Sequence, residues 1–289
     1  MIIVIGGPTG VGKTKLSVEL AKKYDGIIIN GDAMQVYKEM NIATAKIKEE
    51  EKEGIEHYLF DICDLEDVYT IYDYQKDVRK LLKKYSDKNI IIVGGSGLYQ
   101  KAALYNYKFD EEDQTDFSNY DELSNEELYK MVLEKDKDNK VHINNRKRLI
   151  RLLNKKEISH EKSELLYDNV VFIGLTTSRD NLYNIINKRV DKMVEEGLIE
   201  EAKYFYDKKV NCKALNTVIG YKELFKYFDG QLTKDEALDL IKKNSRHYAK
   251  RQYTWYNNQL PTIWVETNYR DFSKTVDEVI SIIENKKIS

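Results

Sequence analysis

The chain has 289 residues, of which 42% are hydrophobic and 33% are charged. This length allows one or two domains with a large core, and the composition excludes a disordered chain. The net charge of −2 excludes a protein that coats nucleic acid through bulk positive charge, although a local basic patch remains compatible with it.

No apolar run approaches the roughly 18 residues that a membrane span needs. The first apolar stretch, Ile2–Ile5, is too short for a signal peptide and leads directly into a glycine loop. We therefore expect a cytoplasmic monomer with no membrane partner. Cys63 and Cys212 lack the number and spacing of a disulfide framework or a metal site, so we expect free thiols.

Short β-branched runs alternate with helical patterns over the first 180 residues. Buried strands are predicted at Ile2–Ile5, Gly26–Ile29, Ile90–Val93 and Val170–Leu175, with helices at Lys13–Tyr24 and Ile71–Tyr85. Beyond residue 178 the pattern is helical up to Pro261, and Thr262–Val265 is predicted to add an edge strand. The fold class is α/β, with a mostly parallel sheet flanked by helices, because the strands are continuously apolar.

Residues 105–140 differ from their surroundings. Acidic residues crowd there, namely Asp110, Glu111, Glu112, Asp113, Asp116, Asp121 and Glu122, and a helical stretch follows from Glu126. We interpret this segment as a small, mainly helical insertion arm on a core made of residues 1–104 and 141–289. A plain acidic surface loop is the alternative.

A phosphate-binding loop follows the first strand. It comprises Gly7, Pro8, Thr9, Gly10, Val11, Gly12, Lys13 and Thr14, which fit G-x-x-x-x-G-K-[ST] between a strand and a helix. The backbone N–H groups would surround a phosphate, Lys13 would reach its terminal oxygen, and the Thr14 hydroxyl would be a ligand of Mg²⁺. The loop predicts a P-loop NTPase-like core and a phosphate ligand without specifying which one.

Two polar residues follow the other predicted strands. Because loops after parallel strands face the ligand crevice, Asp32 is expected near the phosphate loop, as a Mg²⁺ ligand or a general base. The alternative is a helix N-cap. Ser96, in Gly94-Gly95-Ser96-Gly97, is a candidate donor to a phosphate oxygen, with a cap or turn as its alternative.

Arg189 falls within an apolar helical stripe. The stripe consists of Leu182, Ile185, Ile186, Val190 and Met193. An unpaired buried guanidinium is costly, so Arg189 must meet either a structural carboxylate or an anionic ligand, and phosphate chemistry favours the ligand.

Two basic clusters suit nucleic acid. Arg146, Lys147, Arg148 and Arg151 lie on one predicted helix, with Leu149, Leu152 and Leu153 facing a core. The helix that begins at the capping box Thr233–Glu236 carries Arg246, Lys250 and Arg251 among Tyr248, Tyr253 and Trp255. These side chains suit phosphate contacts and base stacking, and a solvated helix face is the alternative.

Taken in order, these features resemble the bacterial type of tRNA dimethylallyltransferase (tRNA isopentenyltransferase). The resemblance runs nearly end to end and includes Gly31-Asp32, Gln35-Val36-Tyr37, Thr44-Ala45-Lys46, His57-Tyr58-Leu59-Phe60-Asp61, Arg189-Val190-Asp191-Lys192-Met193, Ile219-Gly220-Tyr221-Lys222-Glu223 and Lys250-Arg251-Gln252-Tyr253-Thr254-Trp255. It implies transfer of a dimethylallyl group from dimethylallyl diphosphate to N6 of the adenosine on the 3′ side of the anticodon. The adenine would leave the base stack to reach the donor.

The same resemblance implies roles for single residues. Asp32 would be the general base, Ser96 a hydroxyl near the leaving diphosphate, and Arg189 a diphosphate ligand, with Mg²⁺ at Thr14. Residues implied to contact the tRNA anticodon stem-loop are Asp32, Ala33, Met34, Gln35, Lys147, Arg148, Leu149, Ile150, Arg151, Gly220, Tyr221, Lys222, Lys250 and Arg251, with the insertion arm over the same side. The sequence departs from the family pattern at Ala33 and Met34, commonly Ser and Arg, at Ala43, usually Gly, and in its shorter, more acidic insertion.

Three other functions remain open. The same chemistry could use a free adenine nucleotide as acceptor, although the two basic clusters favour tRNA. An ATP-dependent kinase needs an acid for Mg²⁺, and no acid follows Ile90–Val93, which leaves Asp61 as a weaker candidate. A non-enzymatic RNA-binding module would leave Lys13, Asp32 and Arg189 without a purpose.

Overall fold

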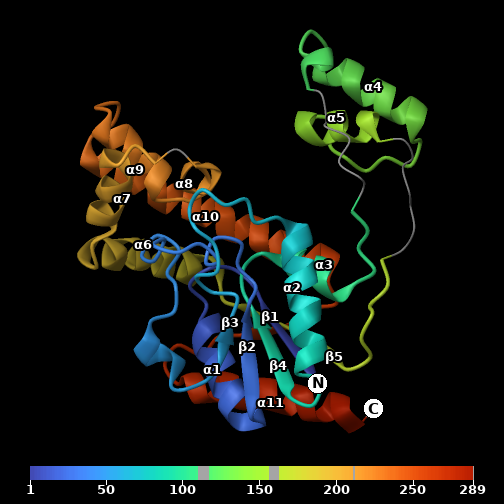
Figure 1. Cartoon of the computed structure of the whole chain (residues 1–289), viewed down its shortest axis with the longest axis vertical. Coiled ribbons are helices and arrows are strands. Elements are labelled where there is room, and N and C mark those ends of the chain that lie inside the picture. The colour runs from blue at the N-terminus through green and yellow to red at the C-terminus, as the bar shows by residue number, and fades with distance from the viewer. Residues whose placement is uncertain (110–116, 156–162, 211, 289) are drawn as a thin grey trace. The chain divides into compact units, whose positions relative to one another are not determined.

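The computed structural model describes residues 1–109, 117–155, 163–210 and 212–288 (Figure 1). They form two compact units, one of residues 1–104 and 166–289 and one of residues 105–165. The first unit contains the sheet and all three candidate catalytic residues, and the second contains the insertion.

The sheet of the first unit is parallel throughout its described strands. These are β1 (Ile2–Gly6), β2 (Gly26–Asn30), β3 (His57–Tyr58), β4 (Asn89–Val93), β5 (Val170–Thr176) and β6 (Ile263–Glu266), in the order β3-β2-β4-β1-β5-β6. The predicted strands are confirmed, including β6 at an edge. The sequence missed β3, because two residues carry no periodicity.

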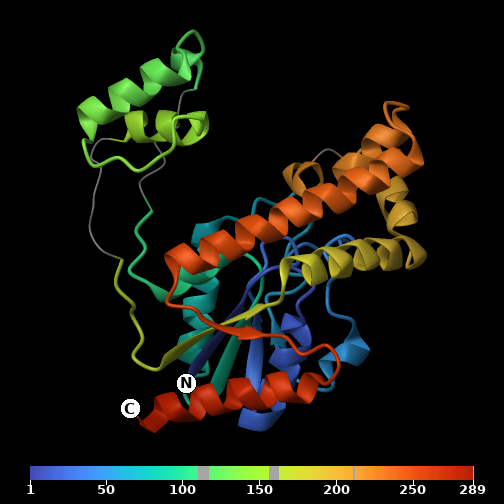
Figure 2. The same ribbon diagram turned by 180° about the vertical axis from the view of Figure 1, so that it is seen from behind.

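Helices cover both faces of the sheet, which explains the continuously apolar strands. On one face α1 (Lys13–Tyr24) and α11 (Phe272–Ile288) pack against the strands through Leu16, Leu20, Val279 and Ile283. Figures 1 and 2 show α2 (Ile71–Lys84) on the opposite face, where it packs against α3 (Gly97–Leu104).

The chain after β5 forms a helical lobe. It contains α6 (Arg179–Glu195), α7 (Leu198–Asp207), α8 (Lys213–Thr217), α9 (Tyr221–Phe228) and α10 (Lys234–Gln259). The core of this lobe includes Phe205, Tyr221 and Leu224, and Val36 and Met40 from the segment after β2 pack into it. A 3₁₀ helix, η1 (Glu49–Lys52), lies later in that segment.

Helix α10 begins at the predicted capping box, which is confirmed. The Thr233 hydroxyl accepts from the Glu236 N–H at 3.3 Å, and the Glu236 carboxylate accepts from the Thr233 N–H at 2.8 Å. From there α10 runs past the carboxyl ends of the central strands (Figure 2). It therefore reaches the edge where the sequence placed the site.

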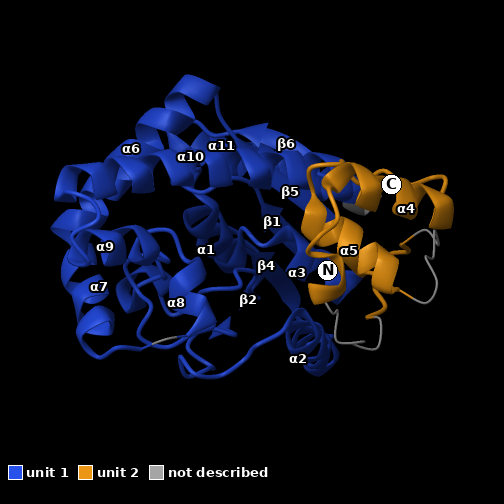
Figure 3. Ribbon diagram, turned by 90° about the horizontal axis from the view of Figure 1, so that it is seen from above, with its two compact units in different colours: residues 1–104, 166–289 blue, residues 105–165 orange. Residues whose placement is uncertain are grey.

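The second unit, orange in Figure 3, comprises Tyr105–Leu165, whereas the predicted insertion arm comprises residues 105–140. It contains η2 (Ser118–Tyr120), α4 (Asn125–Lys135) and α5 (Arg146–Asn154). Helix α5 belongs to this unit because Leu149 and Ile150 share a core with Leu128 and Val132 of α4. Of the predicted acidic cluster, Asp110, Glu111, Glu112, Asp113 and Asp116 lie outside the described residues.

Within the described ranges, no helix combines the length and the apolar character required to cross a bilayer.

Candidate active site

A cavity of about 1030 Å³ opens at the carboxyl ends of the strands in the first unit. It is bounded by the loops after β1, β2 and β4 and by helices α6 and α10. Its lining includes Thr9, Gly10, Gly12, Lys13, Thr14, Asp32, Ser96 and Arg189. The structure therefore brings the three candidate catalytic residues and the phosphate loop to one cavity.

The phosphate loop closes tightly around its own lysine. Gly12 has φ = +92°, a left-handed conformation that favours glycine, and a Cβ there would lie 2.8 Å from the Phe272 ring. The Lys13 ammonium donates to the carbonyls of Gly7 at 3.0 Å and Pro8 at 2.6 Å. Burial and the charge of Arg189 lower the pKa of Lys13 to about 7, and the Asp32 carboxylate opposes that shift. An anion in this loop would restore the protonated form.

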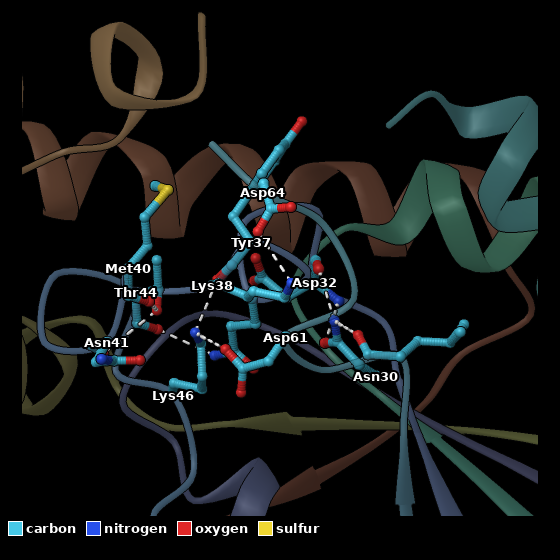
Figure 4. A network of polar contacts seen from close by, with 12 residues as sticks. Asn30, Asp32, Tyr37, Lys38, Met40, Asn41, Thr44, Lys46, Asp61 and Asp64 are labelled. Carbon is cyan, nitrogen blue, oxygen red and sulfur yellow. Dashed lines mark hydrogen bonds and ion pairs between the residues drawn. The ribbon is translucent and has the colours of Figure 1, made fainter. Parts of the chain in front are cut away.

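Asp32 is held through its backbone by Asn30, a fully buried residue that the sequence did not single out (Figure 4). The Asn30 side chain accepts from the Asp32 N–H at 2.8 Å and donates to the Asp32 carbonyl at 3.0 Å and the Leu59 carbonyl at 2.9 Å. Asp32 Oδ1 accepts from the Met34 N–H at 3.0 Å. No helix begins at Asp32 in the described chain, so the N-cap alternative is wrong and the carboxylate closes a turn.

Ser96 joins the loop after β4 to the loop after β2. Its hydroxyl accepts from the Ala33 N–H at 3.0 Å, and its backbone N–H donates to the Gly31 carbonyl at 3.1 Å. A Cβ on Gly94 would lie 2.1 Å from the Gly31 carbonyl carbon, so this approach requires glycine. Ser96 is thus placed beside the Asp32 loop and on the cavity wall.

Arg189 reaches the cavity from α6, where its neighbours Ile186 and Val190 are buried as predicted. Its guanidinium forms neither a hydrogen bond nor an ion pair with any residue that the structure describes. Burial lowers the pKa of Arg189, and the charges of Asp32 and Glu196 oppose that shift. A cation that lacks a paired carboxylate favours the anionic-ligand interpretation over the structural one.

Helix α10 contributes Gln252, a cavity residue that the site prediction missed. Gln252 accepts from the Thr9 N–H at 3.1 Å and donates to the Gly95 carbonyl at 3.1 Å. The Tyr256 hydroxyl lies 3.0 Å from the Gly94 carbonyl oxygen. Ala249, Gln252 and Tyr256 form a buried stripe at helical spacing, so Gln252 gave the same signal as Arg189, a polar residue within an apolar stripe.

Tyr248 also faces the cavity, one turn before Gln252. Burial, the dominant influence, raises the pKa of Tyr248, and the side chains of Ser96 and Gln252 oppose that shift. Tyr248 is therefore a residue of the cavity wall, and its stacking on an unpaired base stays a prediction.

The predicted RNA-contacting residues divide between the two units. Ala33, Met34, Gln35, Lys222 and Arg251 line the cavity, and Lys250 is exposed on α10. In the second unit Lys147, Arg148 and Arg151 are exposed on α5.

Four predicted contacts require correction. Leu149 and Ile150 are core residues of the second unit, since α5 turns its apolar face toward α4. Tyr221 is fully buried and its hydroxyl donates to Glu201, and the buried Gly220 donates its N–H to Glu223. These four residues are buried in the fold and are not exposed for contact with RNA.

Asp61, the weaker candidate for a kinase metal acid, has another partner. It forms an ion pair with Lys46, which also donates to the Tyr37 carbonyl at 2.8 Å (Figure 4). Asp61 is not part of the cavity lining. Among the described residues, no cluster of three His, Cys, Asp or Glu side chains is arranged for a metal. The weaker candidate for a kinase metal acid therefore lies outside the cavity.

The model of the IPP transferase family matches residues 35–259. The chain belongs to this family. The IPP transferase match begins after Asp32, but similarity to individual relatives extends over both the phosphate loop and Asp32. A tRNA dimethylallyltransferase of Anoxybacillus flavithermus is 43% identical over 99% of this chain and 96% of the relative.

Solved structures of similar proteins agree with this IPP transferase assignment. The full-length tRNA isopentenylpyrophosphate transferase of Bacillus halodurans has a TM-score of 0.77 and 40% identity, covering 99% of this chain and 96% of that one. A eukaryotic dimethylallyltransferase acting on tRNA has a TM-score of 0.80 and 26% identity, covering 99% and 79%.

Proposed function

We propose that this IPP transferase is a tRNA dimethylallyltransferase. It transfers the dimethylallyl group of dimethylallyl diphosphate to N6 of the adenosine on the 3′ side of the anticodon, and it releases diphosphate. The observation that carries the proposal is the placement of Lys13, Arg189 and Asp32 around one cavity. Two cations suit a departing diphosphate, and a carboxylate suits the proton of the amine.

The reaction balances with these groups. The C1–O bond of the donor breaks and its electron pair leaves with the diphosphate, whose added charge Lys13 and Arg189 stabilise. The N6 atom forms the new bond to C1, and its proton passes to the Asp32 carboxylate. Enclosure by α6 and α10 limits water near the allylic carbon, which would otherwise be hydrolysed.

Thr14 fits the role of a Mg²⁺ ligand. It stands in the first turn of α1, and its side chain is exposed to the cavity. Mg²⁺ is commonly held by few protein atoms together with phosphate oxygens and water, so a single hydroxyl is sufficient. Bound there, the ion would supply charge neutralisation for the diphosphate.

The acceptor side of the proposal rests on the cavity rim and on the second unit. Arg251 and Lys222 line the cavity, and Lys147, Arg148 and Arg151 form an exposed basic face on α5. These cations suit the phosphates of an anticodon stem-loop. A tRNA substrate supports a cytoplasmic location, and we extend the proposal to a monomer.

The test is prenyl transfer by the purified chain. Dimethylallyl diphosphate labelled in the allyl group is incubated with Mg²⁺ and tRNA, with AMP, or with a tRNA that carries guanosine at the target position. We expect label in the first tRNA alone. Label in AMP but not in tRNA would assign the free-nucleotide alternative, and phosphate transfer from ATP without any prenyl donor would assign the kinase.

A further inference from the structure

Two loops of the site converge on one face of helix α10. Gln252 accepts from the Thr9 N–H of the phosphate loop and donates to the Gly95 carbonyl of the loop after β4, both at 3.1 Å. It is 95% buried, so neither bond competes with bulk water. A single side chain thus connects the loop proposed to hold the donor with the loop that carries Ser96.

The connection continues to the proposed base. Ser96 directly follows Gly95, whose carbonyl accepts from Gln252. Ser96 in turn accepts from the Ala33 N–H at 3.0 Å, directly after Asp32. A polar chain therefore runs from the phosphate loop to the base loop.

The side-chain amide of Gln252 packs closely against Gly95. A Cβ on Gly95 would lie 2.1 Å from Gln252 Nε2 and 3.5 Å from Asp32 Oδ2. Gly95 is thus held between the amide on one side and the carboxylate on the other. Any shift of the Gln252 amide is transmitted to the wall that faces Asp32.

We propose that Gln252 is a positioning residue that sets the separation between the diphosphate-binding loop and the Asp32 carboxylate. The inference rests on the proposed function. Transfer requires N6, C1 and the leaving oxygen in line, and a misplacement of about 1 Å costs on the order of 10²-fold in rate. Gln252 contacts the backbones of both loops without touching the reacting atoms.

The test is Gln252→Met, which preserves the length of the side chain and removes both backbone bonds. The matched control is Gln75→Met. Gln75 is a buried glutamine that donates to the Ala102 carbonyl at 2.8 Å, between α2 and α3 and outside the cavity. Single-turnover rates at saturating donor and tRNA, both KM values, diphosphate affinity and urea unfolding are measured for the full chain.

We expect Gln252→Met to lower kcat about 100-fold, while both KM values and the diphosphate Kd change less than threefold. Gln75→Met should lose comparable stability and keep kcat within twofold. A Gln252→Met kcat within threefold of the wild type, or an equal loss in both variants, would overturn the proposal.

A second variant tests the proposal in case the Gln252→Met protein does not fold. Gln252→Glu keeps an acceptor for the Thr9 N–H and removes the donor to the Gly95 carbonyl. We expect a five- to tenfold lower kcat with unchanged KM values, and an unchanged kcat would overturn the proposal. A wild-type chain that does not prenylate tRNA would instead refute the proposed function.

Discussion

Lys13 and Arg189 are two cations at one cavity, and the positive charge of Arg189 contributes to a Lys13 pKa of about 7. Like charges at this proximity are unfavourable without an anion between them. A bound diphosphate would offset the repulsion between the two cations, because each cation would then stabilise the negative charge of the ligand.

Diphosphate binding should take up a proton. At pH 8 a lysine with a pKa of about 7 is mostly neutral, and a bound anion moves the Lys13 pKa back toward its ordinary 10.5. Binding of diphosphate then takes up about one proton from the buffer at pH 8 and only a small fraction of a proton at pH 6. The affinity for diphosphate falls as the pH rises above 7. Calorimetric titrations with diphosphate in Tris and in HEPES measure this uptake. Lys13→Met is the control, and an enthalpy independent of buffer in the wild type would contradict the prediction.

Arg189→Met should stabilise the unliganded protein while weakening anion binding. The substitution replaces a partly buried cation without a paired carboxylate by an apolar side chain, for which we expect a gain of about 1–2 kcal/mol in the free energy of unfolding. Diphosphate affinity should fall at least about tenfold. Urea unfolding and calorimetry test both effects. Arg179→Met, an exposed position on the same helix, should change neither, and a destabilised Arg189→Met protein would mean that the arginine is structural.

Asp32→Asn should abolish base function and leave the loop intact. The Asn30 clamp acts on the backbone of residue 32, and an asparagine oxygen can still accept from the Met34 N–H. We expect kcat to fall about 10²- to 10⁴-fold with tRNA Kd changed less than threefold. Asp64→Asn, which alters an exposed pair with Lys38, is the control. Transfer at the wild-type rate in Asp32→Asn would remove this residue from the base role.

Glu201→Gln should loosen the segment that supports Gln35. The Glu201 carboxylate accepts from the backbone N–H groups of Asn41, Ile42 and Ala43 at 2.9–3.1 Å. Gln35 in turn donates to the Thr44 carbonyl at 3.0 Å. Loss of the charge should cost about 2 kcal/mol of stability and raise the KM for tRNA.

Urea unfolding, tRNA kinetics and hydrogen exchange at residues 41–43 measure the Glu201 effect. Glu200→Gln is the adjacent exposed control and should match the wild type. Unchanged exchange at residues 41–43 in Glu201→Gln would show that the carboxylate does not hold the segment.

Local patterns in the sequence were sufficient for the sheet and for most of the cavity. Apolar runs predicted five of the six described strands, since a strand buried on both faces leaves a continuous signal. The G-x-x-x-x-G-K-T loop placed Lys13 and Thr14, and the rule that loops after parallel strands share one edge placed Asp32 and Ser96. Arg189 was recognisable because a cation within an apolar stripe needs an explanation.

Tertiary structure decided the partners of these residues. The Asn30 clamp, the Glu201 contacts and the Gln252 bridge join segments whose relation no local periodicity encodes, since each depends on how separate helices and loops pack. Packing also decided that α5 belongs to the second unit. Its apolar face packs against α4, and the sequence pattern of α5 alone does not name that partner. By itself the sequence determined which groups are present at the site, whereas only the packing of α6 and α10 over the strand ends decided how those groups are held.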